Sequence, residues 1–143
     1  RSGGFTIGVG CKPHSQLSRH CDIGIETAVG AEVVAGSTRL RAGTATKMVL
    51  NMLSTGAMVR LGHVYKNLMV NVQPKNEKLL DRARRIVAAA AGVDFDKASA
   101  ALEASGRSVK PAIVMAKLGV SREDAERRLR DSGHRLRVAL GEA

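Results

Sequence analysis

Residues 5–30 read FTIGVGCKPHSQLSRHCDIGIETAVG, and this stretch decides the fold. It holds two short apolar runs, FTIGVGC at residues 5–11 and DIGIETAVG at residues 22–30, whose Ile and Val spacing is typical of buried strands. The runs begin about fifteen residues apart, which favours neighbouring strands of a parallel sheet. QLSRHC, between them, is then expected to form a short helical or turn crossover.

After these runs the apolar period becomes helical. The change comes at Ser37 or Thr38, either of which can cap a helix through its hydroxyl, and the pattern ends at Gly56 or Gly62. The turn before this helix is therefore a strand-to-helix corner at the carboxyl end of a sheet, where α/β proteins bind ligands. The apolar positions that recur at three- and four-residue steps are Leu40, Ala42, Met48, Val49, Met52, Leu53 and Met58.

The rest of the chain predicts a connector followed by helices. HVYKNLMVNVQP, residues 63–74, is expected to be irregular, with His63 and Tyr65 as packing groups. NEKLLDRARRIVAAAAG, residues 76–92, predicts one long helix with Asn76 as its N-cap and Gly92 as its stop. We therefore expect two parts, a sheet-bearing part at residues 1–74 and a helical module at residues 75–143.

The helical module contains an internal repeat. GVDFDKASAALEASG, residues 92–106, and GVSREDAERRLRDSG, residues 119–133, share Gly, Val, Ala, Leu and Ser at the same offsets with a period of 27. Asp94 and Ser121 are the expected caps. SVKPAIVMAKLG, between the repeats, predicts an apolar helix with Pro111 in its first turn. The pattern indicates a compact three-helix module, which most simply serves packing or dimer support.

Composition narrows the classes of function. The chain has 143 residues, room for one domain or for part of one with a small module, and no apolar run approaches the roughly 20 residues of a membrane span. No charged-then-apolar leader is evident, so we expect a soluble cytoplasmic protein. Because the chain begins with Arg1 rather than Met, we also expect it to be a piece of a longer polypeptide.

The net charge of +10 does not favour nucleic-acid binding. Lys and Arg number eight against three acids in residues 1–74 and fifteen against ten in residues 75–143, so the excess is spread out. Three aromatic residues give no stacking platform for bases. The alternating charges of SREDAERRLRDSGHRLR are typical of a solvated helix face. An anionic small molecule such as a sugar phosphate would suit the charge equally well.

Two cysteines raise the question of a metal. Cys11 and Cys21 enclose His14 and His20, but Cys-x2-His-x5-His-Cys matches no structural zinc pattern. The simpler interpretation is two reduced thiols, one at a strand end and one in a loop. We predict no metal site.

GSTRLRAGTATKMVLNMLSTGAMVRLGHVYKNLMVNVQPKNEKL, residues 36–79, closely resembles the signature stretch of the N-acetylmuramic acid 6-phosphate etherases, which are built on the sugar isomerase (SIS) domain. TIGVGCKPHSQL and the GVxxxxAxxxLxxSG helices extend the resemblance from about residue 5 to residue 140. The implied fold is α/β, the C-terminal part of a SIS parallel-sheet domain followed by a small three-helix module.

The resemblance implies a cytoplasmic lyase of cell-wall recycling. Such an enzyme removes D-lactate from N-acetylmuramic acid 6-phosphate and leaves N-acetylglucosamine 6-phosphate. In the family's proposed chemistry, a base takes the proton at C2 of the open sugar, lactate leaves C3 and water adds, with no metal or organic cofactor. Family members are about twice this length. The resemblance places their two catalytic glutamates and the Ser/Thr loops that hold the phosphate before Arg1, so we expect this chain alone to be inactive.

Within the chain, the resemblance leaves a few candidate site residues, each with an alternative. Glu32 matches a glutamate of the related aminosugar isomerases, or it accepts hydrogen bonds from the following helix start. Ser37 and Thr38 bind substrate, cap the helix, or do both. Lys47 faces an anionic substrate or is simply exposed. Lys78 is similar to a lysine near the family's sugar site, or it lies on a solvated first helical turn.

Other groups and functions stay open as well. Arg39 and Arg41 either shape a pocket rim or lie on the surface. The Met48, Met52 and Met58 face is either ordinary core or a dimer contact. Three functions fit: part of an etherase that pairs with its missing N-terminal half or a second copy, a non-catalytic SIS-type sugar-phosphate sensor, and a helical interaction module.

Overall fold

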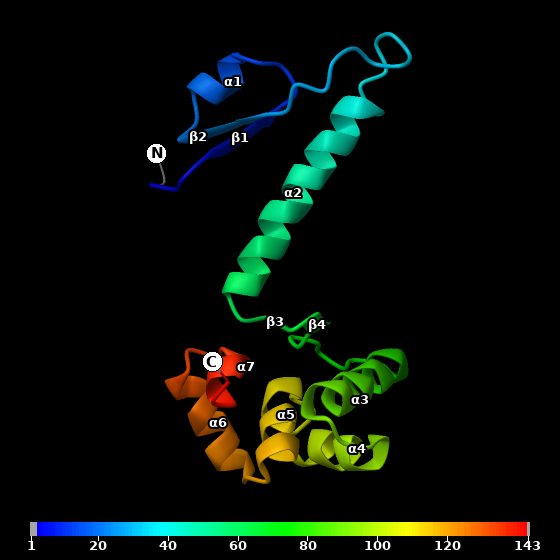
Figure 1. Ribbon diagram of the computed structural model, residues 1–143, viewed down its shortest axis with the longest axis vertical. Helices are drawn as coiled ribbons and strands as arrows, with labels where there is room; N and C mark the ends of the chain where they lie inside the picture. The colour runs from blue at the N-terminus through cyan, green and yellow to red at the C-terminus, as the bar shows by residue number, and fades with distance from the viewer. Residues whose placement is uncertain (1–2, 143) are drawn as a thin grey trace. The chain divides into compact units, whose positions relative to one another are not determined.

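The computed structural model describes residues 3–142 and divides by its internal contacts into two compact units, Arg1–Gly56 and Ala57–Ala143 (Figure 1). It is a mixed α/β structure. The division falls inside α2, upstream of the boundary at residues 74 and 75 that the sequence predicts. Within residues 3–142, no helix combines the length and the apolarity needed to cross a membrane.

The first unit begins with a parallel strand pair, as predicted. β1 (Ile7–Gly10) pairs with β2 (Ile23–Glu26) in a register that sets Ile7 opposite Ile23. The crossover is the short helix α1 (Gln16–Arg19), also as predicted, and the Ser15 hydroxyl accepts a hydrogen bond from the Ser18 amide to cap it.

Two glycines let α1 lie directly on the strands. A Cβ added at Gly8 would lie 2.7 Å from the Cys21 sulfur, and one added at Gly24 would lie 2.6 Å from the Ser18 Cβ. Contacts this short require displacement of α1 or of the loop that follows it, so both strand positions need a residue without a side chain.

The first unit ends at Gly56, within α2 (Arg41–Arg60), and this helix begins later than predicted. The Ser37 and Thr38 hydroxyls make no hydrogen bond to its start within the described residues, so the prediction that either caps the helix is wrong. The reason is that Glu32 occupies that role. Gly62, with φ +73°, follows the end of α2 as predicted, whereas Gly56 lies inside the helix.

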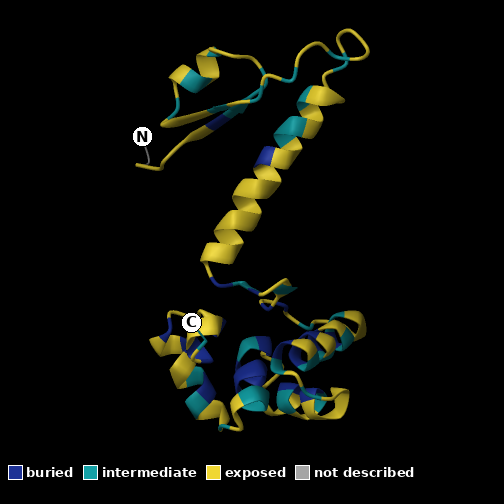
Figure 2. Ribbon diagram, in the orientation of Figure 1, coloured by how far each residue is buried: buried dark blue, intermediate teal, exposed yellow. Residues whose placement is uncertain are grey.

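The first unit buries few of the apolar residues that the sequence placed in a core (Figure 2). Of α2, only Val49 is buried, whereas Met48, Met52 and Met58 are 56%, 63% and 49% exposed. The prediction of two buried strands is wrong for this chain, since Ile7 and Ile23 are exposed. Within the described residues, the pair is a two-stranded sheet, which cannot be enclosed as a full parallel sheet is.

After the last turn of α2, the second unit forms a hairpin where we predicted an irregular connector. β3 (Val64–Tyr65) and β4 (Leu68–Met69) pair antiparallel, with Tyr65 opposite Leu68. A two-residue turn joins them, and Lys66 at its start adopts φ +54°. The sequence Lys-Asn lacks the glycine that usually marks such a turn, which explains why the hairpin was missed.

The helices that follow agree closely with the sequence pattern. The side chains of Asn76, Asp94 and Ser121 each accept a hydrogen bond from the first turn of a helix, and Gly92 ends the first helix in the left-handed conformation. The five helices are α3 (Glu77–Ala91), α4 (Phe95–Ala104), α5 (Val109–Leu118), α6 (Arg122–Asp131) and α7 (Leu136–Ala139).

These helices surround a single apolar core. The apolar α5 contacts both repeat helices, α4 and α6, as well as α3 and α7. Leu102, Ala112 and Ile113 have no exposed surface, and the core cluster also includes residues of the hairpin, of the segment after it and of all five helices. The second unit therefore has a closed core, in contrast to the first.

Candidate functional site

The candidate site lies in the first unit, where the loops after the strands meet the start of α2. The Cys11 thiol, just beyond β1, lies 3.2 Å from the Thr27 hydroxyl, 3.6 Å from the Thr46 hydroxyl and 3.4 Å from the Ala42 carbonyl oxygen. These contacts hold the first turns of α2 at the carboxyl ends of both strands. Sheet edges of this kind are where α/β proteins bind ligands.

Glu32 fixes the start of α2. Its two carboxylate oxygens accept hydrogen bonds from the amides of Arg41 at 2.9 Å and Ala42 at 3.0 Å. These bonds, the one from Ala42 first, lower the pKa of Glu32. The interpretation that Glu32 accepts hydrogen bonds from the helix start is confirmed, and the lowered pKa makes the carboxylate a weaker base in this arrangement.

Thr38 and Lys47 come together in a shallow pocket of about 500 Å³. The pocket carries two hydroxyls, one ammonium and one amide, all of which can bind the oxygens of an anion. Ser37 does not line it. The Ser37 amide instead donates to the Val34 carbonyl oxygen, and the Thr38 carbonyl oxygen accepts from the Gly43 amide at 2.8 Å. The lining residues are Thr38, Ala42, Gly43, Thr46, Lys47, Leu50 and Asn51.

The remaining predicted residues lie apart from this pocket. Lys78 is exposed on the first turn of α3, in the second unit. Arg41 donates from Nη1 to the Ala31 carbonyl oxygen, which folds its side chain back on the preceding loop. Arg39 is exposed. Within the described part of the chain, no group of three or more His, Cys, Asp or Glu side chains could hold a metal ion.

Glu26, at the end of β2, was missed by sequence reasoning. Its carboxylate accepts hydrogen bonds from the amides of His14 at 2.8 Å and Ser15 at 3.0 Å. The Ser18 hydroxyl, followed by these two amides, lowers the pKa of Glu26 to about 2. An acid at the carboxyl end of a strand, facing the loop of its neighbour, was the available signal. Its effect is to hold the loop after β1 against β2.

Comparison with known proteins covers nearly the whole chain. The chain is 51% identical over 135 residues to an N-acetylmuramic acid 6-phosphate etherase of Pectobacterium atrosepticum. The aligned residues make up 94% of this chain and 45% of the relative. The identity is 53% over 140 residues for the etherase of Rubrobacter xylanophilus, covering 98% of this chain and 46% of that relative. In sequence, this chain is similar to the C-terminal half of N-acetylmuramic acid 6-phosphate etherases.

A third relative shows the same relation. An etherase of Mycolicibacterium smegmatis is 49% identical over 140 residues, covering 98% of this chain and 47% of that protein. No family model matches the chain. The chain spans somewhat less than half the length of the etherases that it matches, so it carries one half of the sequence that those proteins have.

Proposed function

We propose that this chain forms the C-terminal half of a sugar-phosphate lyase that cleaves D-lactate from N-acetylmuramic acid 6-phosphate in the cytoplasm. The observation that carries the proposal is an identity of about half over 94–98% of the chain to proteins named for that reaction. The relatives are longer than the chain. The activity is therefore proposed for the whole protein and not for these 143 residues alone.

The exposed surface of the first unit supports this reading. Phe5 is 70% exposed, and Ile7 and Ile23, opposite each other on the strand pair, are both 46% exposed. Burying one such side chain is worth roughly 1.5–3 kcal/mol, so leaving several in water is costly. Further strands and helices of a SIS sheet would cover them. We therefore infer that the strand pair is the margin of a larger parallel sheet.

The shallow pocket at the start of α2 supplies part of the substrate contacts in this proposal. The Lys47 ammonium and the hydroxyls of Thr38 and Thr46 line it and are suited to the oxygens of a phosphorylated sugar. Glu32 holds the helix start that shapes this pocket. We assign it the task of positioning, because both of its oxygens are already bonded.

The apolar face of α2 is proposed as a contact with a second copy or with the N-terminal half. Met48 and Met52 lie one helical turn apart and are both more than half exposed. Methionine adapts its shape to irregular apolar partners, which suits a contact surface. A size-exclusion mass of the chain alone and of an upstream-extended protein would show which pairing occurs.

Lactate release from N-acetylmuramic acid 6-phosphate tests the function. We expect release by a protein extended upstream to the length of its relatives and none by the 143-residue chain. In the extended protein, Lys47→Gln should raise KM, whereas Arg60→Gln, which removes an equal charge from the last turn of α2, should not. Substrate binding without lactate release would instead indicate a sensor. If the extended protein shows neither binding nor release, the proposal is refuted and an interaction module remains as the interpretation.

A further inference from the structure

The second unit contains a cavity of about 910 Å³ that the proposed reaction does not use. It is bounded by the segment after β4, the first turn of α5 and the last turn of α6. Val70, Pro111 and Leu129 give it apolar walls. Its size is in the range of cavities that take small organic ligands.

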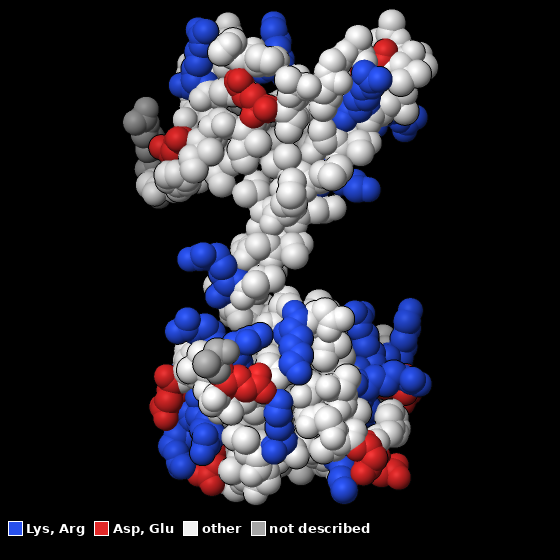
Figure 3. Space-filling view, in the orientation of Figure 1, with Lys and Arg blue, Asp and Glu red and all other residues white. Residues whose placement is uncertain are grey.

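The polar side chains around this cavity are mostly cations. Lys75, Arg107, Lys110 and Arg130 line it together with one carboxylate, that of Glu126. This carboxylate is already bonded to the Nε of Arg122 at 2.8 Å, and Arg122 does not line the cavity. Figure 3 shows that basic side chains also outnumber acidic ones on the visible face of this unit. The cavity therefore favours an anion.

Three of the four cations have no carboxylate of their own. Within residues 3–142, Lys75, Lys110 and Arg130 form no ion pair, whereas Arg107 pairs with Glu103. The Lys110 ammonium donates instead to the His134 carbonyl oxygen at 2.9 Å. Desolvation lowers the pKa of Lys110, and a bound anion would offset that cost by supplying the missing opposite charge.

The start of α5 adds backbone donors at the same place. Ser108, its N-cap residue, makes no side-chain capping bond, and Pro111 has no amide hydrogen. Within the described residues, the amides of Val109 and Lys110 have no acceptor. Free amides at a helix start bind oxyanions, and the helix dipole adds to the attraction.

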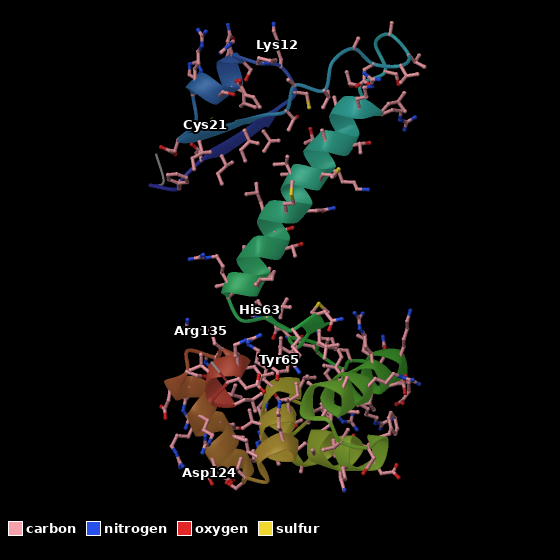
Figure 4. All side chains as sticks on the ribbon, viewed as in Figure 1. Lys12, Cys21, His63, Tyr65, Asp124 and Arg135 are labelled. Atoms are coloured by element: carbon pink, nitrogen blue, oxygen red, sulfur yellow. The ribbon has the colours of Figure 1, made fainter. Side chains whose placement is uncertain are left out.

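His63 is a further polar residue in the wall of this cavity. It lines the cavity, and its Nδ1 atom is buried without a hydrogen-bond partner in the described structure. Figure 4 shows His63 just beyond the end of α2, near Arg135. The two segments are in close contact, since a Cβ at Gly62 would lie 3.1 Å from the His134 carbonyl oxygen. Buried polar atoms normally have partners, so His63 Nδ1 is an exception within the described residues.

We propose that this cavity binds a small phosphate monoester. The phosphate oxygens would accept hydrogen bonds from the Val109 and Lys110 amides and from the charged side-chain groups of Lys75, Lys110 and Arg130. The organic part of the ligand would lie along the apolar wall. A dianion with several acceptor oxygens uses two amides and several cations together, which a neutral ligand cannot do. This site lies in a different unit from the pocket at the start of α2 and does not depend on the proposed etherase reaction.

A titration of the full chain with glucose 6-phosphate, followed by proton–nitrogen NMR, tests this site. We expect the amide signals of Val109 and Lys110 to shift and to saturate, with glucose at equal concentration leaving them in place. The Lys75→Gln/Arg130→Gln double variant should weaken binding about tenfold. Both side chains are exposed and make no ion pair in the described structure, so the fold should persist, which the Tm will check.

Arg82→Gln is the matched control, because Arg82 is exposed on α3 and does not line the cavity. It should bind glucose 6-phosphate as the unmodified chain does. The proposal is overturned if the Val109 and Lys110 signals stay in place up to about 10 mM ligand, or if glucose shifts them equally. It is also overturned if Arg82→Gln weakens binding as much as the double variant. Shifts at Ala42 and Lys47 report on the pocket at the start of α2, so the two proposals fail separately.

Discussion

Glu142→Gln should destabilise the second unit, because Glu142 ties the end of the chain to the core. Its carboxylate accepts hydrogen bonds from the buried Tyr65 hydroxyl at 2.8 Å and from the Lys117 ammonium at 2.6 Å. Figure 4 labels Tyr65 among the helices of this unit. Hydrogen bonds to charged groups contribute about 1.5–3 kcal/mol when buried. The side chains of Glu142 and Lys117 are 30% and 28% exposed, so we discount the loss to about 1 kcal/mol.

Thermal unfolding followed by circular dichroism measures this loss. For a unit of this size, 1 kcal/mol corresponds to a fall in Tm of about 4–8 °C at pH 7. Glu103→Gln is the control, since Glu103 also forms ion pairs but is exposed on the helix surface, and its Tm should fall by less. An equal fall for both variants would refute the reasoning, because it would show that any lost ion pair has the same effect.

The pH dependence of the same pair of proteins gives an independent check. Hydrogen bonds from Lys117, then Tyr65, lower the pKa of Glu142 below its ordinary value of 4.5. A lowered pKa in the folded state stabilises the protein above the unfolded pKa, and this contribution is lost as the pH falls through the folded value. The difference in Tm between the chain and Glu142→Gln should therefore be full at pH 7, begin to shrink as the pH falls below 4.5, and vanish as the pH falls through the folded pKa. A constant difference would contradict this account.

Three further predictions concern the first unit. The loop after β1 should stay bonded to Glu26 above pH 4.5 and loosen only as the pH falls toward about 2. The NMR shifts of the His14 and Ser15 amides would report this loosening, and loosening near pH 4.5 would contradict the assignment. Gly24→Ala should speed amide exchange in β2, since the new Cβ meets α1, with a cost of about 1–3 kcal/mol; unchanged exchange would show that α1 moves freely. Gly56→Ala should stabilise α2 around this position by about 0.5–1 kcal/mol and so slow the exchange of nearby amides, because nothing lies within 4 Å of the added carbon. Faster exchange would reveal an undetected clash.

Local signals in the sequence predicted local structure well. The caps at Asn76, Asp94 and Ser121 and the stop at Gly92 were all confirmed, because each depends on one side chain and the few backbone groups next to it. The parallel pairing of β1 and β2 was also confirmed. The hairpin of β3 and β4 was missed because Lys66 in its turn has a positive φ, which is uncommon for lysine and is not signalled by the residue type.

The start of α2 shows why capping within the first unit was harder to predict. The pattern offered Ser37 and Thr38, which lie next to the helix in sequence. The cap that forms is Glu32, which bonds the amides of Arg41 and Ala42 nine and ten residues away. A loop that doubles back brings a distant carboxylate to the helix start, and no rule based on adjacent residues describes it. The same folding back leaves Thr38 free to line the shallow pocket with Lys47.

The exposed apolar residues of the first unit are the strongest structural argument for a larger assembly. Ile7 and Ile23 follow the pattern of buried strands but are exposed, whereas most apolar positions in the helices of the second unit are buried, with Leu102 and Ile113 fully so. The apolar pattern of the sequence thus coincides with burial in the second unit but not in the first. The departure is expected if the covering elements belong to a segment or a second copy outside these residues, because the selective pressure that keeps Ile and Val in a strand is burial. A covering partner would restore agreement between pattern and structure without any change in the strand pair itself.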